Sequence, residues 1–63
     1  MFDWDQVKPR INQAATKQNA EFYKTLPESQ RSLWISQKLG IRETFYDFDL
    51  IAQTLDSRLK DLG

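Results

Sequence analysis

The chain has 63 residues, enough for one domain, and its nine Lys and Arg side chains balance nine Asp and Glu side chains. It contains neither Cys nor His, which excludes disulfides and the metal sites built on thiolate or imidazole. The same absence removes the usual general base and the strongest nucleophile near neutral pH, and so short a chain has little volume for an active-site pocket. We therefore expect a single domain over residues 1–63 that is not an enzyme and holds no metal or cofactor.

A first helix is expected over residues 9–24. Apolar side chains recur at steps of three and four residues along it and just beyond its ends, which predicts one apolar stripe: Val7, Ile11, Ala14, Ala15, Phe22 and Leu26. Pro9 fits the first turn, because proline lacks the N–H group that later turns need. Trp4 and Val7 are expected in a preceding turn that folds back over the helix.

The second helix is expected to begin at Thr25-Leu26-Pro27-Glu28. The Thr25 hydroxyl can accept from the Glu28 amide while the Glu28 side chain reaches back, and Pro27 has the φ that a first turn needs. The helix then carries three apolar side chains toward the core: Leu33, Trp34 and Leu39.

Gly40 allows two descriptions of the middle of the chain. It can take the left-handed conformation that ends a helix, with Ile41 as the hydrophobic contact that follows. Alternatively, it lies inside one continuous helix that bends there. The first description is favoured.

The third helix carries the strongest periodicity in the chain. Seven apolar residues are separated alternately by four and three positions, the spacing of a coiled-coil seam: Ile41, Phe45, Phe48, Ala52, Leu55, Leu59 and Leu62. Glu43 is expected in its first turn, and Asp56 with Lys60 forms a favourable pair four residues apart. Ile51 widens the stripe beside the seam, whereas Leu50 points away from it.

These elements predict an all-α protein, either a small three-helix bundle or a bent helical hairpin, whose third helix has a coiled-coil-like seam. The apolar surface of that helix is large for a chain with so little else to cover it. We therefore predict a homodimer through the seam, with an intramolecular bundle closed by the second helix as the alternative.

Two sets of surface side chains are candidates for binding. Tyr46 and Leu50 lie off the seam, and with Trp34 they predict an apolar surface for a partner protein, since interfaces favour aromatic residues; scattered exposed apolar residues would be ordinary too. The other set is a row of basic residues seven apart: Arg10, Lys17, Lys24, Arg31 and Lys38. This row could follow a nucleic-acid backbone, but a solvated face is the favoured interpretation.

Residues 34–46, with Leu39-Gly40-Ile41 as the turn, resemble the helix-turn-helix core of bacterial regulators. The resemblance implies DNA binding by the helix that follows Gly40. The spacing departs from that family pattern, because the apolar residues Phe45 and Phe48 come one position early. The same helix carries three carboxylates that would face phosphates: Glu43, Asp47 and Asp49.

The function expected from the sequence is that of a small regulator or adaptor that binds another protein through helical surfaces. The first alternative is a helix-turn-helix DNA-binding regulator, and the second is a structural component of a larger assembly. The apolar runs are only two or three residues long, far below a spanning helix or a signal-peptide core, so we expect a cytoplasmic protein without a membrane partner.

Overall fold

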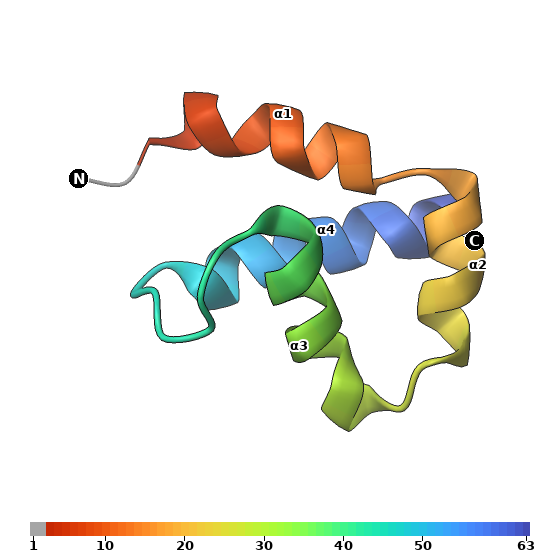
Figure 1. The fold of residues 1–63 in the computed structure, drawn as a ribbon. Coiled ribbons are helices and arrows are strands. Elements are labelled where there is room, and N and C mark those ends of the chain that lie inside the picture. Colours follow the sequence, from red (N-terminus) through yellow and green to blue (C-terminus); the bar gives the residue numbers. More distant parts are fainter. Residues whose placement is uncertain (1–2) are drawn as a thin grey trace.

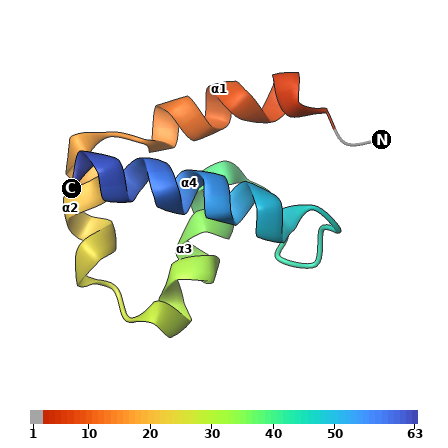
Figure 2. The same ribbon diagram turned by 180° about the vertical axis from the view of Figure 1, so that it is seen from behind.

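The computed structural model describes residues 3–63, in which four α-helices and no strand are present. The helices are α1 (Trp4–Ala14), α2 (Lys17–Thr25), α3 (Glu28–Leu39) and α4 (Phe48–Leu62). In Figures 1 and 2, α1 and α4 run along the long direction of the molecule, whereas α2 and α3 run across it. The prediction of an all-α fold is confirmed. The prediction of three helices is wrong, because the segment expected to form the first helix forms two.

The first break in the chain lies at Ala15 and Thr16, between α1 and α2. Thr16 is in extended conformation, with φ −112° and ψ 158°, and its hydroxyl accepts a hydrogen bond from the Asn19 amide at 3.1 Å. The Asn19 side chain donates to the carbonyl of Ala14 at 2.9 Å. These two side chains therefore cap the end of one helix and the start of the next. Pro9 lies in the interior of α1 rather than in its first turn, because the helix already begins at Trp4.

The break changes which side of the second segment faces the core. Val7, Ile11 and Ala14 are buried on α1 as expected. In α2, however, the buried residues are Ala20 and Tyr23, and Phe22 is 53% exposed. A continuous helix would have kept Phe22 on the stripe, but the non-helical Ala15–Thr16 step resets the periodicity.

The start of α3 differs from the expected capping box. The Thr25 hydroxyl donates to the carbonyl of Phe22 at 2.7 Å, so Thr25 closes α2 instead of opening α3. Pro27 occupies the position before the first helical residue, and no side chain caps that end. The buried residues of α3 are Trp34, Ile35 and Leu39, whereas Leu33 is exposed.

Gly40 ends α3 in the left-handed conformation, with φ 67° and ψ 30°, so the favoured description of this position is confirmed. The amides of Gly40 and Ile41 both donate to the carbonyl of Ser36, and the Ser36 hydroxyl donates to the carbonyl of Ile41 at 2.6 Å. Ile41 is partly buried and packs against the core. This arrangement satisfies a carbonyl that the end of a helix would otherwise leave without a partner.

Residues 41–47 form two successive turns rather than the start of the predicted third helix. The Phe45 amide donates to Arg42, and the Phe48 amide donates to Phe45, before α4 begins at Phe48. Ile41, Phe45 and Glu43 are therefore not part of α4, and the helical seam starts only at Phe48. The predicted pair of Asp56 and Lys60 is confirmed, with a distance of 2.9 Å between the charged atoms.

The core lies where α2 packs against α4, α1 against α3 and α3 against α4. Leu55 and Leu59 are 0% and 1% exposed within the single chain, and Phe48 and Ile51 are buried with them. Ala52 is partly buried, while Leu62 at the helix end is exposed. This burial weakens the reason given for the homodimer, because the single chain already covers the seam from Phe48 to Leu59. Self-association remains a prediction.

Candidate functional site

The three residues predicted to bind a partner do not form one surface. Trp34 is buried, and its ring lies 5.3 Å from that of Tyr23 and 6.3 Å from that of Phe22, both on α2. Tyr46 is 71% exposed, and the centre of its ring lies 4.9 Å from that of Phe45, with the two rings tilted by 38°. In Figure 1 the loop that carries Tyr46 lies on the side of α3 opposite α2. The contacts of Trp34 therefore separate it from the other two residues.

Leu50 lies on the outward side of α4 and is 49% exposed. The helical positions that share this side are polar: Thr54, Ser57 and Asp61. A single exposed leucine among polar side chains is common on protein surfaces. The binding role predicted for Tyr46 and Leu50 stays a prediction.

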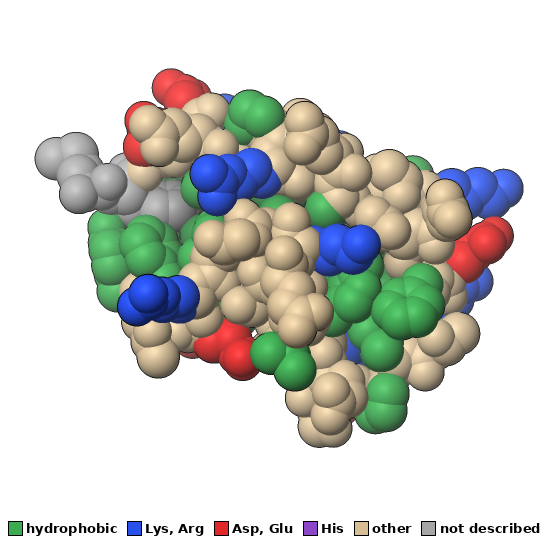
Figure 3. All heavy atoms as spheres, viewed as in Figure 1, with side chains coloured by type: hydrophobic (Ala, Val, Ile, Leu, Met, Phe, Trp, Pro, Cys, Tyr) green, Lys and Arg blue, Asp and Glu red, His purple; other side chains and the backbone are tan. Residues whose placement is uncertain are grey.

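The row of basic residues is divided over three helices, and the breaks at residues 15–16 and 26–27 remove the regular spacing. Arg10 donates to the last carbonyl of α3, Lys24 lies 3.4 Å from the carbonyl oxygen of residue 63, and Arg31 and Lys38 lie over aromatic rings. Lys17 is exposed at the start of α2. Figure 3 shows basic side chains as separate groups. The five basic residues therefore do not form the single face that their spacing of seven residues predicted.

The connection between α3 and α4 is also longer than the turn of a helix-turn-helix motif. Such motifs join their two helices by a turn of about three or four residues. Here residues 40–47 separate α3 from α4. The helix that was expected to follow Gly40 directly is therefore displaced along the chain, and two of its three carboxylates, Glu43 and Asp47, lie outside α4.

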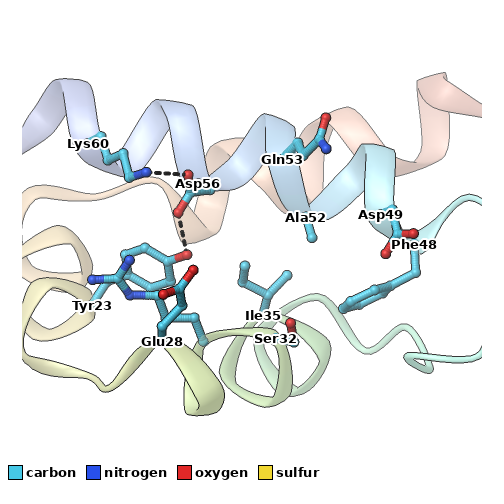
Figure 4. Close-up of a pocket in the computed structure, with 11 residues that line it drawn as sticks. Tyr23, Glu28, Ser32, Ile35, Phe48, Asp49, Ala52, Gln53, Asp56 and Lys60 are labelled. Carbon is cyan, nitrogen blue, oxygen red and sulfur yellow. Dashed lines mark hydrogen bonds and ion pairs between the residues drawn. The ribbon is translucent and has the colours of Figure 1, made fainter.

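A groove with charged rims lies between α3 and α4, and we call it the α3–α4 groove (Figure 4). It has a volume of about 370 Å³. Its floor is formed by apolar or aromatic side chains: Tyr23, Ile35, Phe48 and Ala52. Its rims carry polar and charged side chains from the two helices: Glu28, Arg31 and Ser32 on α3, and Asp49, Gln53, Asp56 and Lys60 on α4.

One end of the α3–α4 groove contains a short chain of polar contacts. The Tyr23 hydroxyl donates to a carboxylate oxygen of Asp56 at 2.5 Å, and Lys60 pairs with the other oxygen at 2.9 Å. The guanidinium carbon of Arg31 lies 5.1 Å from the centre of the Tyr23 ring. The Nε atom of Arg31 is buried and has no hydrogen-bond partner among the described residues. These contacts hold α2, α3 and α4 together at this end.

The surroundings of Tyr23 and Asp56 shift the pKa values of both side chains further from neutral pH. Burial, followed by the hydrogen bond to Asp56 and its negative charge, raises the pKa of Tyr23. Burial alone would raise the pKa of Asp56, but the hydrogen bonds from Tyr23 and Lys60, with the charges of Lys60 and Arg31, outweigh it and lower that pKa. Tyr23 is thus protonated and Asp56 ionised at neutral pH, and the pair has no proton to exchange there.

The groove was not recognised from the sequence. Its components come from three separate segments, and the break at Thr16, which turns Tyr23 toward Asp56, was not anticipated. The Thr16 and Asn19 pair was the available signal, since both residue types are frequent at helix ends. Among residues 3–63, no three Asp, Glu, His or Cys side chains are placed to hold a metal ion.

This chain matches no protein-family model, no curated protein and no solved structure. In the described part of the chain, no helix has both the length and the hydropathy needed to cross a membrane.

Proposed function

We propose that this protein is a small, non-enzymatic regulator or adaptor that binds a segment of another protein in the α3–α4 groove. The observation that supports this best is the combination of an apolar floor with charged rims on two neighbouring helices. A partner helix could place an apolar side chain over Ala52, the one floor residue that is only partly buried. Its polar side chains would then meet the rims.

The charges on the rims support a polypeptide ligand. Asp56 and Lys60 neutralise each other, and Arg31 lies over the Tyr23 ring. Glu28 on α3 and Asp49 on α4 are exposed and line the groove from opposite rims. A partner segment with basic side chains at its edges would complement both carboxylates. Catalysis is disfavoured, because neither Tyr23 nor Asp56 changes its protonation near neutral pH.

Site-specific photo-crosslinking tests the proposal in an extract of the cells that produce the protein. A photoreactive amino acid replaces Gln53, which lines the groove, or Ser57, an exposed residue of α4 that does not line it. We expect one discrete crosslinked protein from position 53 and none from position 57. Ala52→Arg, which fills the groove, should abolish the product, whereas Leu50→Arg on the outward side should leave it. Loss of the product in Leu50→Arg alone would favour the surface predicted around Tyr46 and Leu50 instead of the groove.

Equal crosslinking from both positions, or a product unaffected by Ala52→Arg, would refute the groove as the binding site. Salt-dependent retention on duplex DNA by the same protein would instead favour the DNA-binding alternative. Sedimentation of the chain within a large complex in that extract would favour the structural alternative.

A further inference from the structure

We propose a second binding surface, at the C-terminal end of α3, for an acidic peptide segment of a partner protein. We call it the cationic aromatic face. It combines a hollow of about 470 Å³ between α1, α2 and α3 with an aromatic pair beside it. The polar side chains that line the hollow are Arg10, Gln13, Asn19, Gln37 and Lys38. The aromatic pair is Phe22 and Trp34.

Lys38 joins the two parts of this face. It lines the hollow, and its ammonium nitrogen lies 5.7 Å from the centre of the Trp34 ring. Phe22 contacts the same Trp34 from α2 and leaves more than half of its own surface exposed. A ligand in the hollow would therefore have an apolar surface next to it.

The described residues that line the hollow carry only positive charges, although the whole chain has no net charge. Arg10 and Lys38 are the two cations of this face, and no carboxylate is present among the described residues that line the hollow. Arg10 uses one guanidinium nitrogen to bond the carbonyl of Leu39 at 3.0 Å, which leaves its other donors for a ligand. In Figure 3, no acidic side chain is visible in the area between the two central basic groups.

The carboxamides indicate a peptide rather than a nucleic acid. Gln13, Asn19 and Gln37 each offer an acceptor oxygen, and Gln13 and Gln37 offer amide donors as well, since the Asn19 amide already donates to the carbonyl of Ala14. These groups match the N–H and C=O groups of an extended backbone. Trp34 is too deeply buried to serve as a stacking platform for bases. Two cations would also make few phosphate contacts. An acidic segment with one aromatic or apolar residue would use the cations, the carboxamides and the ring of Phe22 together.

The probe for this proposal is a short blocked peptide of glutamates around one central phenylalanine. It is titrated into the full chain, followed by proton–nitrogen correlation NMR. We expect saturable shifts in the side-chain amides of Gln13, Asn19 and Gln37 and in the indole of Trp34. Binding should weaken with added salt and be about fivefold weaker for Lys38→Glu. Lys8→Gln, an exposed residue of α1 outside the hollow, is the matched control and should bind normally.

Several results would overturn the proposal. One is the absence of shifts at millimolar peptide, and another is equal binding of the same peptide with glutamines in place of glutamates. A single-stranded oligothymidylate that shifts the same signals at lower concentration would assign the face to nucleic acid instead. None of these results depends on the α3–α4 groove, so the two proposals stand or fall separately.

Discussion

Tyr23 connects α2 to α4 through a single hydroxyl group that is bonded to Asp56. Tyr23→Phe keeps the buried ring and removes only that hydrogen bond, so we expect the free energy of unfolding to fall by about 1 kcal/mol. Tyr46→Phe is the matched control, because the Tyr46 side chain is largely exposed, and should leave stability unchanged. Urea denaturation followed by circular dichroism measures both. Equal stability of Tyr23→Phe and the parent chain would mean that the contact contributes nothing.

The same pair of residues predicts how stability depends on pH. Asp56 has a lower pKa in the folded state than in the unfolded chain, so its contribution is present above about pH 4 and is lost as the pH falls through the folded value. Tyr23 has a raised pKa, so its contribution is complete below about pH 10 and is lost as the pH rises further.

Urea midpoints measured across the pH range test the predicted loss of stability at acidic pH and at alkaline pH. Asp56→Asn should flatten the acidic decline, whereas Asp61→Asn, an exposed residue of the same helix, should retain it. Tyr23→Phe should flatten the alkaline decline. An acidic decline in Asp56→Asn as steep as in the parent chain would show that other carboxylates cause it.

At the scale of the helices, Thr16 caps the start of α2, and Thr25 closes the same helix instead of opening the next one as expected. Thr16 accepts from the Asn19 amide at the start of α2, so Thr16→Ala should lower the free energy of unfolding by about 1 kcal/mol. Thr25 donates to a carbonyl within α2, so Thr25→Ala should change it by less than about 0.5 kcal/mol. Thermal and urea unfolding of the two variants side by side provides the test, and the reverse order would contradict this assignment.

Local signals predicted the helical class, the end of α3 at Gly40 and the Asp56–Lys60 pair, because each depends on neighbours in sequence. The break at Thr16 was missed, since the alanines before it favour helix and the need to turn α2 onto α4 is a tertiary effect. For the same reason, the sequence pattern predicted Phe22 in the core, where the structure places Tyr23. The predicted seam began too early in the chain, because Ile41 and Phe45 keep the spacing of three and four residues although they lie in the loop before α4.

For the whole molecule, the burial of α4 predicts which leucines the fold requires. Leu59→Asp should abolish most of the helical signal, because an unpaired charge in the core costs more than about 4 kcal/mol and a chain of this size has little stability to lose. Leu50→Asp is the matched control and should retain the helical signal, since Leu50 lies on the outward side. Circular dichroism distinguishes the outcomes. A folded Leu59→Asp variant would contradict the position of α4.

During synthesis on a ribosome, α1 and α2 emerge before the helices against which they pack. Their lengths are 11 and 9 residues, below the roughly 12–15 residues at which an isolated helix becomes even marginally stable. α1 has to wait for α3, and α2 has to wait for α4, which follows it by more than 20 residues. The core is therefore complete only after α4 has left the ribosome, and until then the apolar side chains of α2 that pack on α4 stay uncovered.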